Sequence, residues 1–151
     1  MAKQKEIIST LNSLIETLKD GQEGFKQAAE AVKDPSLKSL FSEFSLQRSQ
    51  FAGELQAEAL QMGESEPEES SSASGAMHRA WINLKSAVTS GDDHAILAEC
   101  ERGEDSAVKE YKEAMEEDLS SPVSDLISRQ YARVQSAHDC IKQLRDAAKT
   151  S

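Results

Sequence analysis

The segment DDHAILAECERGEDSAVKEYKEAMEEDL, residues 92–119, decides the fold that this sequence predicts. When the segment is placed on a helix, its apolar residues share one face at the three-and-four spacing of a buried stripe. Glu104 lies inside that stripe, whereas most of the other charged residues point away from it. A carboxylate on a buried face must be paired, protonated or bound to a metal. The stripe consists of Ile96, Leu97, Cys100, Ala107, Tyr111, Ala114 and Met115.

The composition favours one helical domain. The chain has 151 residues, of which 38% are hydrophobic, 5% aromatic and 29% charged, and this is typical of a helical bundle with a sizeable core. The net charge of -10 argues against nucleic acid as a partner, because that needs a basic face, and against an anionic membrane surface. No apolar run reaches membrane-spanning length, and the first residues, MAKQKEII, lack a signal-peptide core. We therefore expect a cytoplasmic protein.

Apolar periodicity predicts two helical hairpins within a single domain of residues 1–151. The first hairpin, residues 4–62, pairs helices at about 4–32 and 37–62, because Asp34-Pro35 stops one helix and starts the next. The second hairpin, residues 92–148, pairs helices at about 92–119 and 123–148 through Ser120-Ser121-Pro122. Loops this short make consecutive helices antiparallel neighbours.

The connection between the hairpins has two predicted parts. Residues 63–75 read GESEPEESSSASG and are too polar to pack, so we expect a mobile linker. Residues 77–88 have helical periodicity, which predicts a short helix, either a lid across the bundle or a docking helix for a partner. In that helix Trp81 and Ile82 lie on faces about 100° apart, and Leu46 points away from the stripe of its own helix. These apolar residues without a place in the core predict a homodimer.

Several other side chains are assigned from their place on the predicted helices. Cys100 and Cys140 lie on or near apolar faces and are expected to be buried free thiols, because no metal-binding cysteine spacing is present. His94 lies near a helix start, and we expect it to face solvent. Glu99 and Glu101 belong to an acidic run and are expected on a solvated face.

Four phrases of the sequence resemble an uncharacterised bacterial family of ferritin-like proteins, one of the domain-of-unknown-function groups. The resemblance extends from about Ile7 to Leu144. It implies an all-α, ferritin-like four-helix bundle of two antiparallel hairpins, with an extra short helix in the middle connection. The family has no established activity to lend. The phrases are LNSLIETLKDGQEGFKQAAEAVKDPSLKSLF, HRAWINLKSAV, ILAECERGEDSAVKEY and RQYARVQSAHD.

The metal-binding members of the wider ferritin-like superfamily place one Glu on each of two helices and Glu-x-x-His on each of the other two. Glu104 matches a single Glu of this pattern. Gln135-Ser136-Ala137-His138 keeps the histidine but has an amide in place of the carboxylate, and Leu46-Gln47-Arg48-Ser49 has neither ligand. One carboxylate cannot balance the charge of two irons, and Arg48 would repel them. The sequence therefore predicts no di-iron centre and no cofactor.

We instead predict that Glu104 pairs with Arg48 in a polar layer at mid-height of the bundle, where it fixes the register of the helices. The alternatives are a single metal ion held by Glu104 and His138, a full di-iron oxidase, or an unforeseen ligand. No catalytic motif is readable, so no catalytic residue is predicted. Two classes of function stay open: a non-catalytic binding, structural or stress protein, and a metal-binding redox or iron-storage protein of ferritin type. The predicted layer consists of Gln22, Gln47, Arg48, Glu104, Gln130 and His138.

Overall fold

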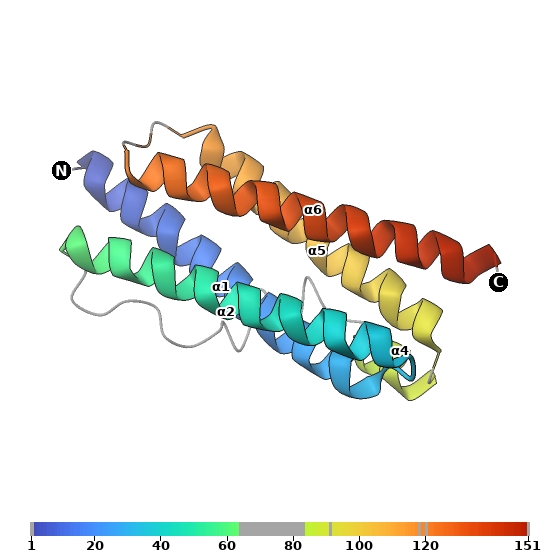
Figure 1. Cartoon of the computed structure of the whole chain (residues 1–151). Helices are drawn as coiled ribbons and strands as arrows, with labels where there is room; N and C mark the ends of the chain where they lie inside the picture. The colour runs from blue at the N-terminus through green and yellow to red at the C-terminus, as the bar shows by residue number, and fades with distance from the viewer. Residues whose placement is uncertain (1, 64–83, 91, 118, 120, 151) are drawn as a thin grey trace.

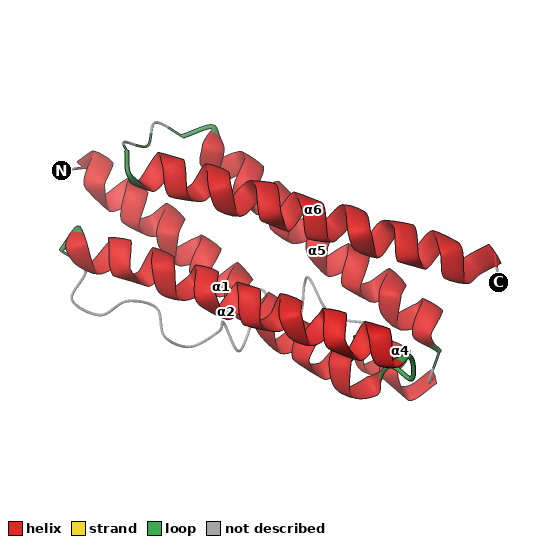
Figure 2. Ribbon diagram, viewed as in Figure 1, coloured by secondary structure: helices red, strands yellow, loops and turns green. Residues whose placement is uncertain are grey.

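The described residues form helices and their connections (Figure 2). The computed structural model describes residues 2–63, 84–90, 92–117, 119 and 121–150. The prediction of an all-α fold is confirmed. No helix in these ranges has an apolar stretch long enough to span a membrane. The helices are α1 (Ala2–Ala31), α2 (Pro35–Gln61), α4 (Leu84–Ser90), α5 (Asp93–Met115) and α6 (Val123–Thr150).

Two helical hairpins make up the bundle (Figure 1). The helices α1 and α2 pack along each other, and so do α5 and α6. The hairpins meet mainly where α1 packs against α5, whereas α2 and α6 have little contact. Figure 1 shows α2 and α5 running in the same direction. This order of directions is the one expected of a bundle with one long crossover.

The turn between α1 and α2 is built from short polar signals. Asp34 caps α2, because its carboxylate accepts a hydrogen bond from the backbone N–H of Ser36 at 2.8 Å. Pro35 occupies the first turn of the helix, where its missing N–H is not needed. The carboxylate of Asp93, at the start of α5, accepts from the backbone N–H groups of Lys33 and Asp34 at 2.9 and 3.1 Å. The connection between α1 and α2 is thereby hydrogen-bonded to the start of the second hairpin.

The apolar core is divided into two clusters at opposite ends of the bundle. One lies where α1 and α6 begin, and the other lies near the α1–α2 turn, where α4 packs against α5 and α1. The first cluster includes Leu11, Leu14, Ile15, Leu18, Leu55, Tyr111, Ile127 and Val134. The second includes Phe25, Phe41, Leu84, Ile96, Leu97, Cys100 and Ile141. Arg48 and Glu104 are buried but belong to neither cluster.

The helix bounds differ from the predicted ones mainly in α5. This helix was expected to reach Leu119 but ends at Met115. Because Met115 is the last residue of the helix, its side chain is 42% exposed, and its predicted place in the buried stripe is wrong. The bounds of α1, α2 and α6 lie within two residues of the predicted ones.

The predicted short helix at residues 77–88 is described only from Leu84 onward. There Leu84 is buried in the second core cluster and Val88 is packed against it. Trp81 and Ile82, which contributed to the dimer prediction, lie outside the described residues, as does the predicted linker beyond residue 63.

The two free cysteines differ in burial. Cys100 is fully buried, whereas Cys140 is only half-buried, so the prediction of two buried thiols is wrong for Cys140. Burial raises the pKa of the Cys100 thiol, and the negative charges of Glu104 and Glu99 raise it further. A thiol with a raised pKa and no access to solvent holds little of the reactive thiolate.

We expect an alkylating reagent to modify Cys140 of the native protein well before Cys100. Mass spectrometry after timed iodoacetamide treatment measures the two rates. In denaturant the rates should converge, because burial no longer separates the thiols. Equal rates in the native protein would contradict the packing of Cys100.

Candidate functional site

Arg48 of α2 and Glu104 of α5 form a bidentate ion pair between the two core clusters. The Nη2 atom of Arg48 donates to Oε2 of Glu104 at 2.6 Å, and Nη1 donates to Oε1. Each side chain is only 1% exposed. The planar guanidinium fits a carboxylate in this two-bond arrangement, which fixes direction as well as distance. The pair joins the first hairpin to the second.

The surroundings of Arg48 come from α1 and α2. The guanidinium lies 5.3 Å from the centroid of the Phe25 ring, a cation–π contact. The Nε atom donates to Oε1 of Gln47 at 3.2 Å. A Cβ atom at Gly21 would lie 3.6 Å from Cγ of Arg48, an ordinary contact distance. The buried cation thus has a carboxylate, an amide oxygen and an aromatic face as neighbours.

A second polar network lies closer to α6. The hydroxyl of Tyr111 donates to Oε1 of Gln130 at 2.7 Å, and Nε2 of Gln130 donates to Oε1 of Glu54 at 2.9 Å. Burial raises the pKa of Tyr111, and the charge of Arg48 opposes this rise without cancelling it. The hydroxyl therefore stays protonated and remains a donor. Tyr111 and Glu54 were not among the predicted polar residues, although a tyrosine in a buried stripe usually has a hydrogen-bond partner for its hydroxyl.

A third polar group surrounds His138 on α6. Its Nε2 atom lies 2.5 Å from Oδ1 of Asp105 and 4.0 Å from Oε2 of Glu101, both on α5. Its Nδ1 atom lies 3.2 Å from Oδ1 of Asp139. Burial alone would lower the pKa of His138, but the hydrogen bonds to Asp139 and Asp105 and the charge of Glu101 together raise it above its ordinary value. His138 thus faces carboxylates that the sequence analysis did not assign to it.

The acidic run of α5 is buried, contrary to prediction. Glu99 is 4% and Glu101 is 8% exposed. The reason is that α5 packs against three other helices, α1, α4 and α6. Both carboxylates have cationic partners: Arg102 donates to Glu99 at 3.0 Å, and Arg145 pairs with Glu101. His94, also expected to face solvent, is half-buried.

The six residues of the predicted polar layer fall into separate groups. Arg48, Glu104 and Gln47 form the first, Gln130 belongs to the second, and His138 belongs to the third. Within the described residues, no hydrogen bond links the half-buried side chain of Gln22 to any of them. Within those residues Glu104 pairs with Arg48 and His138 contacts Asp105 and Asp139, and no hydrogen bond or ion pair joins Glu104 to His138.

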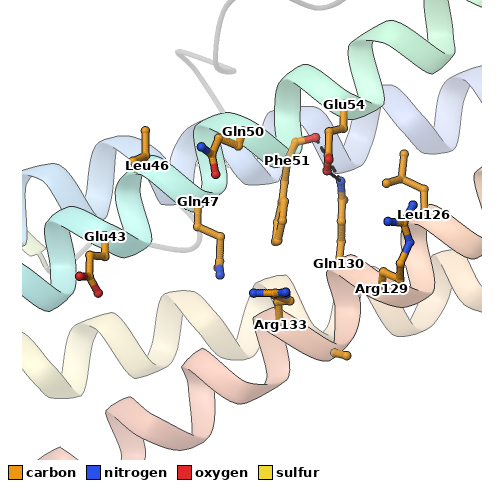
Figure 3. Close-up of a pocket in the computed structure, with 11 residues that line it drawn as sticks. Glu43, Leu46, Gln47, Gln50, Phe51, Glu54, Leu126, Arg129, Gln130 and Arg133 are labelled. Carbon is orange, nitrogen blue, oxygen red and sulfur yellow. Dashed lines mark hydrogen bonds between the residues drawn. The ribbon is translucent and has the colours of Figure 1, made fainter.

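A groove runs between α2 and α6, where the two hairpins have little contact (Figure 3). Its volume is about 630 Å³. The charges along it are separated by helix: Glu43 and Glu54 come from α2, whereas Arg129 and Arg133 come from α6. The remaining lining residues are Leu46, Gln47, Gln50, Phe51, Leu126, Gln130 and Ala132.

These features define an all-α bundle of two hairpins that are joined through a buried arginine–glutamate pair. The chain belongs to the family of the domain of unknown function DUF2383, whose sequence profile matches residues 6–117. The predicted membership of an uncharacterised domain group is confirmed, while the ferritin-like relationship and the degenerate di-iron motif stay predictions. The matched region contains Arg48 and Glu104 but ends before α6, so His138 lies outside it. A search of curated proteins gave no match.

Removing one partner of the buried pair should be strongly destabilising. Glu104→Ala leaves a buried guanidinium without its counter-charge, and we expect it to lower the free energy of unfolding by roughly 3–5 kcal/mol. Glu104→Gln keeps the shape but not the charge and should also destabilise. Denaturant unfolding followed by circular dichroism measures both effects.

Replacing both Arg48 and Glu104 with leucine or methionine should recover most of that loss, because apolar residues of similar volume can substitute for a buried pair. A chelator should not change any of these values if the pair is structural. If all variants unfold within about 0.5 kcal/mol of the wild type, the range of ordinary surface changes, the pair has no structural role.

Proposed function

We propose that this chain is a non-catalytic, ferritin-like helical-bundle protein with a binding, structural or stress-related role. In this proposal the Arg48–Glu104 pair occupies the place that di-iron relatives give to metal. The main observation in its support is that Arg48 donates hydrogen bonds to both carboxylate oxygens of Glu104 in the buried centre of the bundle. The guanidinium supplies the positive charge that a metal would otherwise bring, so the carboxylate has no further cation to neutralise.

Two further observations support this proposal. The helices run in the order expected of a bundle with one long crossover, which is the topology of ferritin-like folds. His138 contacts Asp105 and Asp139 rather than Glu104. The alternative, a redox or iron-storage protein that uses Glu104 and His138 as metal ligands, is supported less well, because each of these side chains already has other partners.

We expect the purified protein to contain well under two irons per chain after expression with added iron, because four of the six ligands of the di-iron pattern are missing. Elemental analysis together with the absorption spectrum measures this. Two irons per chain with an oxo-bridge band would contradict the proposal. Glu104→Gln serves as the control, because a true centre at this position would lose its iron in that variant.

We further propose that the groove between α2 and α6 binds a second copy of this chain. The surface is suited to self-association, because one helix supplies the acidic side chains and the other supplies the basic ones. If a twofold axis runs parallel to the groove, α2 of one copy lies over α6 of the other, so that Glu43 and Glu54 face Arg129 and Arg133. An axis across the groove would place acidic residues over acidic residues. With the axis parallel to the groove, Leu46, which is 60% exposed and lines the groove, is covered by the second copy.

Charge reversal should test this interface. We expect Glu43→Lys with Glu54→Lys to be monomeric, and Arg129→Glu with Arg133→Glu to be monomeric too, because each combination sets like charges against each other. An equimolar mixture of the two variants should form a heterodimer, since both of its contacts are again attractive. Light scattering coupled to size exclusion at micromolar concentration measures the masses.

Two exposed leucines of α2 provide a matched control. Leu46→Asp should weaken the dimer, whereas Leu60→Asp should not, because Leu60 is 51% exposed but does not line the groove. A monomeric wild type, or a mixture of charge variants that stays monomeric, would overturn the proposed interface.

A further inference from the structure

The two ring nitrogens of His138 both face carboxylate oxygens. Nδ1 lies 3.2 Å from Asp139, and Nε2 lies 2.5 Å from Asp105. A neutral imidazole carries one proton, so one of its nitrogens would then meet a carboxylate with no hydrogen between them. Gln135 holds Asp139 in place by donating to the same carboxylate oxygen at 3.0 Å. With the ring proton on the Nδ1 side, the space between Nε2 and Asp105 needs a cation, either a second proton or a metal ion.

Glu101 presents a third ligand atom to the same space. Its Oε1 atom pairs with Arg145, whereas its Oε2 atom lies 4.0 Å from Nε2 of His138. The side chain of Glu101 is only 10% exposed, so it has little freedom to turn into solvent. Arg145 therefore fixes the orientation of this carboxylate and leaves one oxygen directed toward His138.

We propose that Glu101, Asp105 and His138 bind one divalent transition-metal ion of the zinc type between α5 and α6. The three ligand atoms lie within 4.8 Å of one another. Around a tetrahedral zinc ion with bonds of about 2.0–2.1 Å, neighbouring ligand atoms lie roughly 3.3 Å apart. The separations of 2.5 and 4.0 Å from Nε2 fall on either side of this value, so small side-chain rotations bring the ligands into place.

The neighbours of the three ligands have the arrangement that metal sites use around their ligands. A histidine that binds metal through one nitrogen commonly donates its other N–H to a carboxylate, and ligating carboxylates are themselves held by hydrogen bonds. Asp139 takes the first role and Arg145 takes the second. Asp105 is 62% exposed, which leaves a path from solvent and room for a water ligand.

The chemistry of the donors selects the kind of ion. The imidazole nitrogen favours zinc and its transition-metal neighbours over magnesium and calcium, which prefer oxygen ligands alone. The local charge also favours a cation, because the four carboxylates of Glu101, Asp105, Asp139 and Asp146 outnumber the two cations, Arg145 and Lys142. This site does not use Glu104, so it is independent of the buried ion pair.

Calorimetric titration of zinc into untagged, chelator-treated protein tests the site. We expect about one equivalent to bind at neutral pH, with no comparable binding of magnesium. His138→Ala and Asp105→Asn each remove a proposed ligand and should weaken zinc binding about tenfold or more. Asp139→Asn removes the partner that orients His138 and should weaken zinc binding on the order of 10–100-fold. His94→Ala is the matched control and should bind zinc as the wild type does.

Absence of zinc binding in the wild type would overturn this site, as would unchanged affinity in both His138→Ala and Asp105→Asn. An equal loss in His94→Ala would overturn it too, because the effect would then not come from these ligands. Thermal unfolding of each variant without zinc separates loss of fold from loss of binding. Zinc binding that disappears in Glu104→Gln but persists in Asp105→Asn would move the metal to the buried centre and contradict both this site and the proposed function.

Discussion

The bundle depends on one constraint: Arg48 and Glu104 are buried together, and neither can be buried alone. An unpaired charge in the core costs several kcal/mol, so any rotation or sliding of α2 against α5 that separates the two groups is penalised. Apolar side chains on these helices would tolerate such shifts far better, because hydrophobic contact is not directional. The pair therefore selects one register between the hairpins. We regard this selection, rather than added stability, as its contribution.

The division of the core into two apolar clusters follows from the same constraint. The polar level between the clusters holds the buried pair on one side and His138 with its carboxylates on another. Each cluster can pack densely within its own end of the bundle, while the level between them sets how the four long helices face one another. The groove between α2 and α6 opens beside this level, and Gln47 contributes to both the groove and the ion pair.

Helical periodicity was sufficient to predict the all-α fold and most of the buried positions, because a buried stripe needs only the three-and-four spacing of apolar residues. The same pattern identified Glu104 inside one stripe, and this position led to the prediction that Arg48 is its partner. It failed where the outcome depends on the rotation of α5 relative to α6. Glu101 and Asp105 lie only three residues before and one residue after Glu104, and no pattern within one helix decides which carboxylate meets His138. The burial of Glu99 and Glu101 was missed for a related reason, since it arises from packing of α5 against three helices at once.

The seam between the first and the second hairpin has polar contacts at its two ends and at its centre. At one end Asp93 holds the α1–α2 turn, at the centre Arg48 reaches Glu104, and at the other end the hydroxyl of Thr10 donates to Glu117. Each of these contacts links groups that lie far apart in the sequence, and each is lost if the hairpins separate. We therefore expect the two hairpins to unfold as one cooperative unit, with the backbone amides along this seam protected from hydrogen exchange together rather than hairpin by hairpin.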